Sequence, residues 1–186
     1  MSAAREVAKR NGAARLSLRS VAAEAGFAPA ALYVYFRNKN DLMLALAADD
    51  LGDIARVMRQ ACAHADKARG ARTAVSATLD LLSKSETLAA AVIALNSRPD
   101  SRAGRLFNGR LIAVLSALAA ATGAPVDARE GRADVLLVAA TLTGLAMLVR
   151  SGRLEALGLA PDEVLARMPR WLEGAAGRQN FANLAV

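Results

Sequence analysis

Residues 17–42 read SLRSVAAEAGFAPAALYVYFRNKNDL, and this stretch decides the fold. Ser17 is a good N-cap for the helix that follows, because its hydroxyl can accept a hydrogen bond from an unpaired backbone N–H of the first turn. Gly26 breaks this helix, and Pro29 suits the first position of a second short helix. Two short helices joined by a glycine-containing turn predict a helix-turn-helix unit over about 17–36, a layout whose second helix enters the major groove of DNA.

The apolar residues of this unit fall on facing sides of its two helices. The inward-facing set comprises Leu18, Val21, Ala22 and Ala25 on the first helix and Leu32 and Phe36 on the second. Ala22 is small enough to let the helices cross closely, and Phe27 is expected to plug the turn. Two helices packed for purely structural reasons would share much of this pattern, so the pattern favours DNA binding without deciding it.

The rest of the chain is predicted to be helical as well. It contains 45 Ala and 27 Leu among 186 residues, the two residue types with the strongest preference for helix, while aromatic residues make up only 4%. No convincing strand or internal repeat is present, so the expected fold class is all-α. Asn38 is expected to cap a long fourth helix. The other expected helices are 4–11, 73–83, 87–97, 101–122, 128–150 and 161–175.

The positive charge is concentrated at the N-terminus. Residues 1–40 contain seven Lys or Arg and two acidic residues, a net charge of +5, whereas the whole chain carries +7. A basic segment beside a nearly neutral remainder indicates an anionic partner, of which nucleic acid is the first candidate. A solvated basic face is the alternative that charge alone leaves open.

Composition also argues against other classes of protein. A single His and a single Cys, His64 and Cys62, do not provide a zinc site or an internal disulfide. No Ser/His/Asp set or glycine-rich phosphate loop is present, so neither enzymatic activity nor a cofactor is expected. Asp49, Asp50 and Asp53 form an acidic patch that we interpret as a solvated face, and we place His64 and Asp66 in a linker.

The chain has no apolar leader at its start, and a cytoplasmic location is therefore expected. Its longest apolar stretch, 135–149, is shorter than the approximately 20 residues that a membrane span requires. We interpret this stretch as a core helix and expect no membrane partner.

The residues of the helix-turn-helix unit also resemble a known family. The pattern Val-Ala-x3-Gly at 21–26, followed by Leu-Tyr-x-Tyr-Phe-x-Asn-Lys-x-Asp-Leu at 32–42, is similar to the signature of TetR-family transcriptional regulators. The resemblance covers residues 4–46, and the Gly-Leu-Ala phrase at 144–146 is similar to a late helix of many members. The match begins within the family's first helix, so a turn of that helix is expected to be missing.

This resemblance implies a homodimer of two-domain subunits. A DNA-binding domain over 1–46 would bind double-stranded operator DNA, and a domain over 47–186 would dimerise and bind a small, apolar effector that releases the DNA. The family favours a repressor over an activator. The alternative is a helical small-molecule-binding protein of the same fold that has lost DNA recognition. That alternative is motivated by Ala28-Pro29-Ala30-Ala31, which stands where the family often has polar side chains.

The resemblance also implies specific DNA contacts. Lys39 opens the fourth helix, where its charge and the free backbone N–H groups favour a phosphate. Arg19 would reach a guanine, with a salt link to Glu24 or exposure to solvent as the alternative. The tyrosines would bind phosphate or simply pack. The full set of expected DNA-binding residues is Ser17, Arg19, Ala28, Pro29, Ala30, Ala31, Tyr33, Tyr35, Arg37 and Lys39.

Two further sets of residues are expected in the C-terminal domain. The helix over 135–149 is apolar all round and must be covered on every side, and we expect a second subunit to cover part of it. A core that lies wholly within one chain is the alternative. The expected dimer interface contains Thr141, Gly144, Leu145, Leu148, Leu165, Trp171 and Leu172. The expected effector pocket contains Asn96, Phe107, Arg110, Leu111, Thr143, Met147 and Trp171, and plain core packing is the alternative for most of them.

Overall fold

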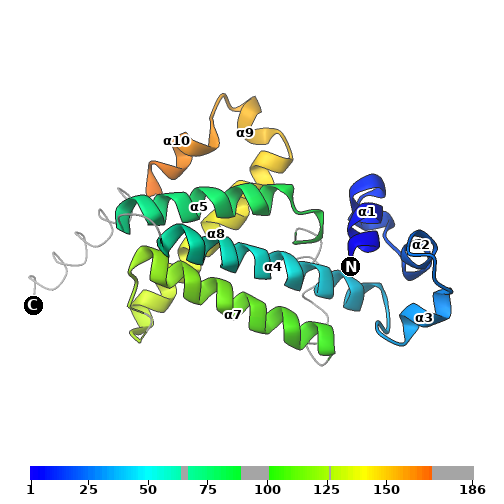
Figure 1. Ribbon diagram of the computed structural model, residues 1–186. Helices are drawn as coiled ribbons and strands as arrows, with labels where there is room; N and C mark the ends of the chain where they lie inside the picture. The colour runs from blue at the N-terminus through cyan, green and yellow to red at the C-terminus, as the bar shows by residue number, and fades with distance from the viewer. Residues whose placement is uncertain (64–66, 89–100, 126, 169–186) are drawn as a thin grey trace, which may run out of the picture.

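The computed structural model describes residues 1–63, 67–88, 101–125 and 127–168 (Figure 1). These ranges are mostly helical and contain no strand, which confirms the all-α fold class. The helices are α1 (Ser2–Asn11), the 3-10 turn η1 (Ala13–Arg15), α2 (Leu18–Glu24), α3 (Pro29–Tyr33), α4 (Lys39–Ala63), α5 (Lys67–Lys84), α7 (Arg102–Thr122), α8 (Arg129–Arg150), α9 (Arg153–Ala156) and α10 (Pro161–Leu165).

One long helix joins the two parts of the molecule. The small helices α1, α2 and α3 form a head at one end, and α4 starts in this head and runs along the larger helical body (Figure 1). Within the body, α4 packs mainly against α7 and α5, and α8 packs against α5 and α7. The helix α4 therefore belongs to both parts of the molecule.

Each part has its own buried apolar core. In the head, residues of α1, η1 and α2 pack with the first turns of α4, with Val7, Leu16 and Leu46 at most 1% exposed. The second core fills the body and includes Ile54, Met58 and other residues at positions from 44 to 154. The two clusters meet on α4, which is why nearly every residue from Asp41 to Ala48 is buried.

Several helix ends follow the local sequence as predicted. Ser17 caps α2, and Asn38 Oδ1 accepts the Asp41 N–H at 3.0 Å at the start of α4. Ser101, which was not predicted as a cap, accepts from Gly104 N at 2.9 Å and caps α7. Gly12 follows α1 with a φ of 77° and a ψ of 153°, a positive-φ conformation that favours glycine.

Other helix bounds differ from the prediction. The helix α5 begins at residue 67 instead of 73. Residues 67–72 are rich in Lys, Arg and Ala, which are good helix formers, and they form the first turns of α5. The short α9 was not predicted, and α10 ends at Leu165 rather than 175. Most of the expected helix over 87–97 lies outside the described residues.

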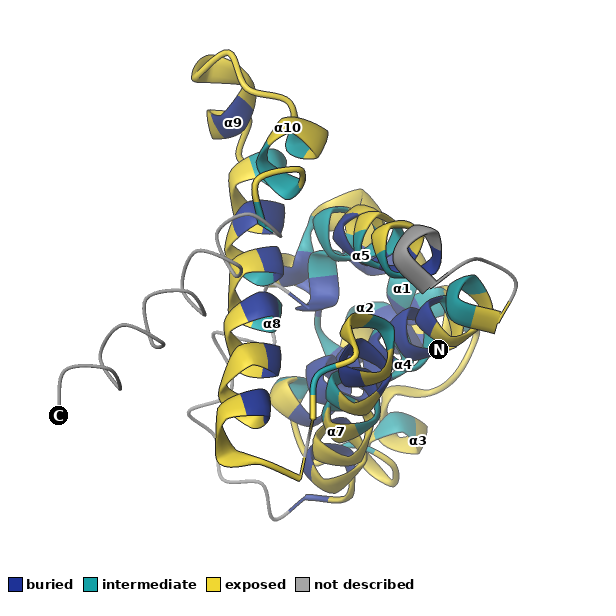
Figure 2. Cartoon of the chain, turned by 90° about the vertical axis from the view of Figure 1, so that its left-hand side faces the viewer, coloured by how far each residue is buried: buried dark blue, intermediate teal, exposed yellow. Residues whose placement is uncertain are grey.

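The two longest body helices after α4 are strongly apolar. By length and composition only, α7 and α8 could each cross a membrane. One side of α8 faces the other helices and is buried, while its opposite side is exposed (Figure 2). The exposed apolar side chains include Leu136, Leu137, Met147 and Leu148, at 56%, 40%, 52% and 38% exposure. This exposure agrees with the prediction that the apolar helix over 135–149 is not fully covered within one chain.

Candidate nucleic-acid interface

The turn between α2 and α3 is fixed by backbone hydrogen bonds. Gly26, with a φ of 71°, follows the last turn of α2, and its N–H bonds to the carbonyl of Ala23. The Phe27 N–H bonds to the carbonyl of Ala22 at 2.9 Å. These two bonds are the Schellman pattern, which satisfies the last carbonyls of a helix and reverses the chain. The geometry is the one that a helix-turn-helix unit requires.

The start of α2 is fixed just as firmly by a pair of serines. Ser17 Oγ accepts the Ser20 N–H at 3.0 Å, and Ser20 Oγ accepts the Ser17 N–H at 3.0 Å. This reciprocal arrangement satisfies two backbone donors. It holds Ser17, an expected phosphate contact, at the N-terminus of α2, where the helix dipole favours an anion.

The expected base-reading segment lies on the surface. Ala28, Pro29, Ala30 and Ala31 are all exposed at the start of α3, and Arg19 is exposed on α2. Tyr33 and Tyr35 are 55% and 76% exposed, so neither ring is buried in the head. Each of these side chains is therefore accessible from outside the single chain.

One residue of this unit contradicts the prediction, and one was missed. Phe27 was expected to plug the turn but is 62% exposed, because Leu32 and Phe36 fill the inner side against the head core. Val34 follows α3 and is 81% exposed. Its place between two tyrosines in the sequence was the signal that could have marked it as part of this surface.

The charged residues near the unit are partly engaged within the chain. Lys39 Nζ donates to the carbonyl of Ala14 at 2.6 Å, which anchors this side chain between η1 and α4. Glu24 pairs with Arg10 rather than with Arg19, so the salt link considered for Arg19 is not formed, and Arg19 is exposed. The pairing with Glu24 raises the pKa of Arg10.

Arg37 is held close to the surface by Asp41. The Asp41 carboxylate accepts from Arg37 Nε at 3.0 Å and from the Arg37 N–H at 3.3 Å. Burial raises the pKa of Asp41, but hydrogen bonds from Arg37 and Ser101 outweigh it and hold the pKa below its ordinary value. Since Ser101 caps α7, Asp41 ties the start of α4 to a helix of the body.

Asp41→Asn is expected to reduce the free energy of unfolding by about 1–2 kcal/mol at pH 7, because it removes the charge from these hydrogen bonds. A depressed pKa stabilises the fold above the unfolded value near 4 and loses that effect as the pH falls through the folded value. The difference between the two proteins should therefore shrink between about pH 5 and pH 3. Urea unfolding at pH 7, 5 and 3.5 measures this, and a constant difference would contradict it.

The described residues of the expected effector pocket differ in their surroundings. Phe107 is 3% exposed in the body core, whereas Met147 lies on the outer side of α8. The Arg110 guanidinium packs over α4 at Gly52, 3.5 Å from where a Cβ would stand. Leu111 and Thr143 are partly buried, and Asn96 and Trp171 lie outside the described residues. A cavity of about 300 Å³ lies elsewhere, between α1, α4 and the end of α5, and none of these residues lines it.

The expected interface residues differ in how far they are exposed. Thr141, Gly144 and Leu148 are exposed on α8, and Leu165 is partly buried against the body core. Leu145 is only 4% exposed and belongs to the body core, so it does not face outward as predicted. Trp171 and Leu172 lie outside the described residues.

The acidic patch on α4 is not simply solvated, as we had interpreted it. Arg5 of α1 pairs with Asp50 at 2.9 Å and lies 3.6 Å from Asp49 and 3.9 Å from Asp53. The patch is thus a contact between head and body. Within the described residues no cluster of three or more His, Cys, Asp or Glu could hold a metal, and His64 and Asp66 lie outside them.

Comparisons with known proteins find a family match for the head and a similar fold for the whole chain. The family model for bacterial regulatory proteins of the tetR family matches residues 1–46, the head and the first turns of α4. No curated protein matches the sequence. The fold is similar to the fatty acid degradation regulator FadR from Bacillus halodurans, with 18% identity, a TM-score of 0.60, and coverage of 89% of this chain and 91% of that one. It is also similar to a protein of Pseudomonas aeruginosa PAO1 named as a transcriptional regulator, with 21% identity, a TM-score of 0.59, and coverage of 94% and 86%. Residues 1–46 therefore match the N-terminal domain of bacterial regulatory proteins of the tetR family, and the fold of the whole chain is similar to that of the two solved structures.

Proposed function

We propose that the chain acts as a homodimeric repressor in the cytoplasm, that it binds double-stranded operator DNA through residues 1–46, and that a small molecule bound by residues 47–186 releases it. The exposed surface of α2 and α3, with its fixed turn and its free alanines and tyrosines, carries this proposal. The protein acts by binding rather than by catalysis, and it needs neither a cofactor nor a membrane.

In this proposal, the residues of the unit divide their roles. Ala28, Pro29, Ala30 and Ala31 face the groove floor, where apolar side chains contact thymine methyl groups, and Arg19 contacts a guanine. Ser17, Tyr33, Tyr35, Arg37 and Lys39 contact phosphates, which position the head without reading sequence. In this proposal Arg19 is the one polar side chain that reads a base directly. The other base contacts are apolar, so the operator is expected to present thymine methyl groups to α3.

The first test is a fluorescence-anisotropy titration of the purified protein with the DNA flanking its gene and with a scrambled duplex, at two salt concentrations. Tight, selective binding that weakens steeply with salt supports the proposal, because phosphate contacts release counterions. A helical carrier that has lost DNA recognition would show no such salt dependence and no difference between the duplexes.

Lys39→Ala is expected to weaken binding to every DNA sequence and to lower the salt slope by about one. The Lys39 ammonium has three donors, of which one goes to the Ala14 carbonyl, so two stay available to a phosphate. Arg59→Ala is the control, since Arg59 is exposed on the body part of α4. If the slope is the same in both variants, Lys39 does not contact phosphate.

The exposed side of α8 is the proposed dimer surface. Its exposed residues recur at helical spacing and form a stripe of apolar and small side chains: Leu136, Leu137, Ala140, Thr141, Gly144, Met147 and Leu148. A stripe of this kind, uncovered within one chain, is what a two-fold interface buries. Met147, which was expected in the effector pocket, is therefore assigned to the proposed interface. Leu145, which was expected in the interface, is not included in it, because it is buried in the body core.

Gly144→Leu is expected to convert the dimer to monomer. A Cβ at Gly144 meets nothing within 4 Å, so the leucine fits the single chain and disturbs only a second copy packed against it. Gly109→Leu is the matched control, because that helical glycine of α7 also faces open space. Sedimentation velocity measures the mass of each variant. A Gly144→Leu dimer as tight as that of the control would place the interface elsewhere.

A further inference from the structure

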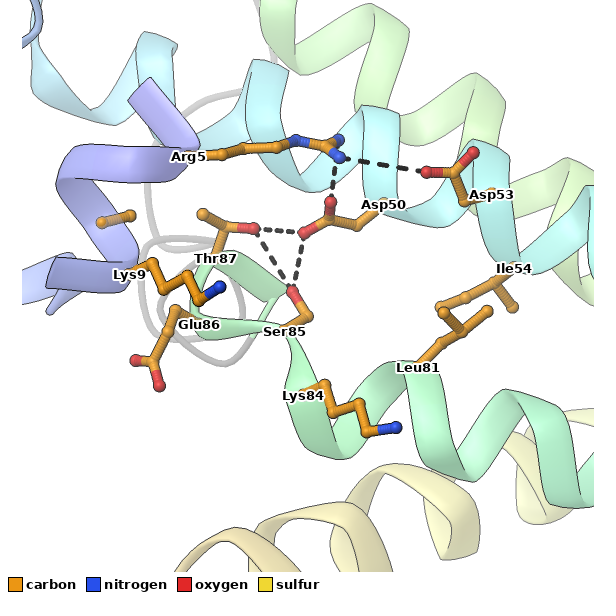
Figure 3. A pocket seen from close by; sticks show the side chains of 11 residues that line it. Arg5, Lys9, Asp50, Asp53, Ile54, Leu81, Lys84, Ser85, Glu86 and Thr87 are labelled. Atoms are coloured by element: carbon orange, nitrogen blue, oxygen red, sulfur yellow. Dashed lines mark hydrogen bonds and ion pairs between the residues drawn. The ribbon is translucent and has the colours of Figure 1, made fainter. Parts of the chain in front are cut away.

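A cavity lies where the head meets the body. It has a volume of about 300 Å³ and is lined by α1, by α4 and by the end of α5 with the turn that follows (Figure 3). This volume is at the lower end of the range for small-molecule sites. Its apolar lining comes from Ala8, Ile54 and Leu81. A molecule bound here would touch both the DNA-binding head and the body.

The acidic side chains around the cavity already have partners. Asp50 pairs with Arg5 at 2.9 Å, and its other oxygen accepts from Ser85 Oγ at 2.7 Å and from the Thr87 hydroxyl. Asp53 pairs with Arg56 at 3.0 Å. Since these carboxylates are satisfied by the protein, they do not call for a cationic ligand.

Glu86 is satisfied in the same way by a residue outside the cavity. It pairs with Arg150 of α8 at 3.0 Å, and its carboxylate points away from Asp50 and Arg5 (Figure 3). Arg150 Nη1 also donates to the carbonyl of Ser85 at 3.1 Å. These bonds hold the turn after α5 between α8 on one side and Asp50 on the other.

Two nitrogen donors at the cavity are left without an acceptor. Lys9 makes no ion pair or hydrogen bond with the described residues, and its side chain extends from α1 toward Ser85 (Figure 3). The Nε of Arg5 is buried and has no hydrogen-bond partner within the described part of the chain. The Arg5 Nε, as a buried donor without an acceptor, destabilises the fold, so an acceptor placed beside it is favoured.

We propose that this junction cavity binds a small organic monocarboxylate, with its carboxylate at Lys9 and Arg5 and its short apolar body over Ala8, Ile54 and Leu81. The cavity lining carries three cationic and three acidic side chains, so a single negative charge is tolerated and a dianion is repelled by the carboxylates. The apolar lining selects a carboxylate with a hydrocarbon body over a bare inorganic anion.

The same site offers a way to move the head. A bound carboxylate competes with Asp50 for Arg5, and the pair of Arg5 and Asp50 joins α1 to α4 and the turn after α5. This part of the inference rests on the proposed function, because its output is a change in DNA affinity. By linkage, DNA and the carboxylate weaken each other's binding by the same factor.

Calorimetric titration of the full chain without DNA tests the site. The probes are butanoate, hexanoate, octanoate and benzoate, with hexanamide as the uncharged match of hexanoate. At least one carboxylate is expected to bind once per chain with a Kd of about 1 mM or tighter, and hexanamide is not. Lys9→Gln should weaken binding at least about tenfold. Arg59→Gln removes an equal charge from α4 away from the cavity and should leave binding unchanged.

Three results would overturn the site: no binding by any carboxylate, equal binding by hexanamide, or equal binding by Lys9→Gln. A DNA titration with and without the best carboxylate then tests the coupling. Unchanged DNA affinity at saturating carboxylate overturns the coupling and leaves the site standing. Absence of any selective DNA binding overturns the proposed function, and the calorimetric result on the site is unaffected.

Discussion

Gly131→Ala is expected to destabilise the protein, because the added methyl group would collide with backbone. Gly131 is buried in the first turn of α8, and a Cβ there would stand 2.1 Å from the carbonyl oxygen of Pro125 and 2.7 Å from its carbon. That carbonyl also accepts the Ala128 N–H at 3.1 Å, so it cannot withdraw without losing a hydrogen bond. Overpacking against backbone costs about 1–3 kcal/mol, which corresponds to a fall in Tm of about 2–12 °C for a chain of this size.

Gly144→Ala is the matched control for this prediction. It lies in the same helix, where its Cβ meets nothing within 4 Å in the single chain. Alanine is the better helix former by about 0.5–1 kcal/mol, so this variant should be no less stable than the parent unless the dimer surface is crowded. Thermal unfolding at one protein concentration compares the two. Equal stability of both variants would mean that the turn between α7 and α8 relaxes freely around Gly131.

Ala31→Glu is expected to lower DNA affinity about 100-fold, a loss of about 3 kcal/mol. Ala31 is exposed in the middle of α3, and glutamate is a good helix former, so the head should keep its fold. In the proposed complex this side chain faces the groove. There a carboxylate would be repelled by the phosphates and would lose its water without gaining a partner.

The control for this prediction carries the same charge at a distant site. Ala120 is exposed near the end of α7 that lies away from the head, so Ala120→Glu should bind DNA nearly as well as the parent (Figure 1). Anisotropy titrations at one salt concentration compare the two variants, and circular dichroism checks that both are folded. Equal affinity of both would show that α3 does not face the DNA.

Local chemistry explains which features could be predicted. The caps by Ser17, Asn38 and Ser101 and the break at Gly26 act on neighbouring backbone groups within a few residues. The motif over 21–42 could be recognised for the same reason, since its residues build one compact unit. Boundaries such as the start of α5 were less certain, because several good helix formers stand in a row there and no residue marks an end.

By itself, the sequence determined an all-α chain, a helix-turn-helix unit near the N-terminus and the family of that unit, because each depends on neighbouring residues. Only the tertiary structure decided which of these side chains are free. In the structure Phe27 is exposed and Lys39 donates to the carbonyl of Ala14. On α8, Leu145 is buried and Met147 is exposed. The tertiary structure also joined Arg5 to Asp50, two residues 45 positions apart. The physical reason is that a helical periodicity tells which residues share a face but not which partner covers that face, and partners distant in sequence are set only when the helices pack.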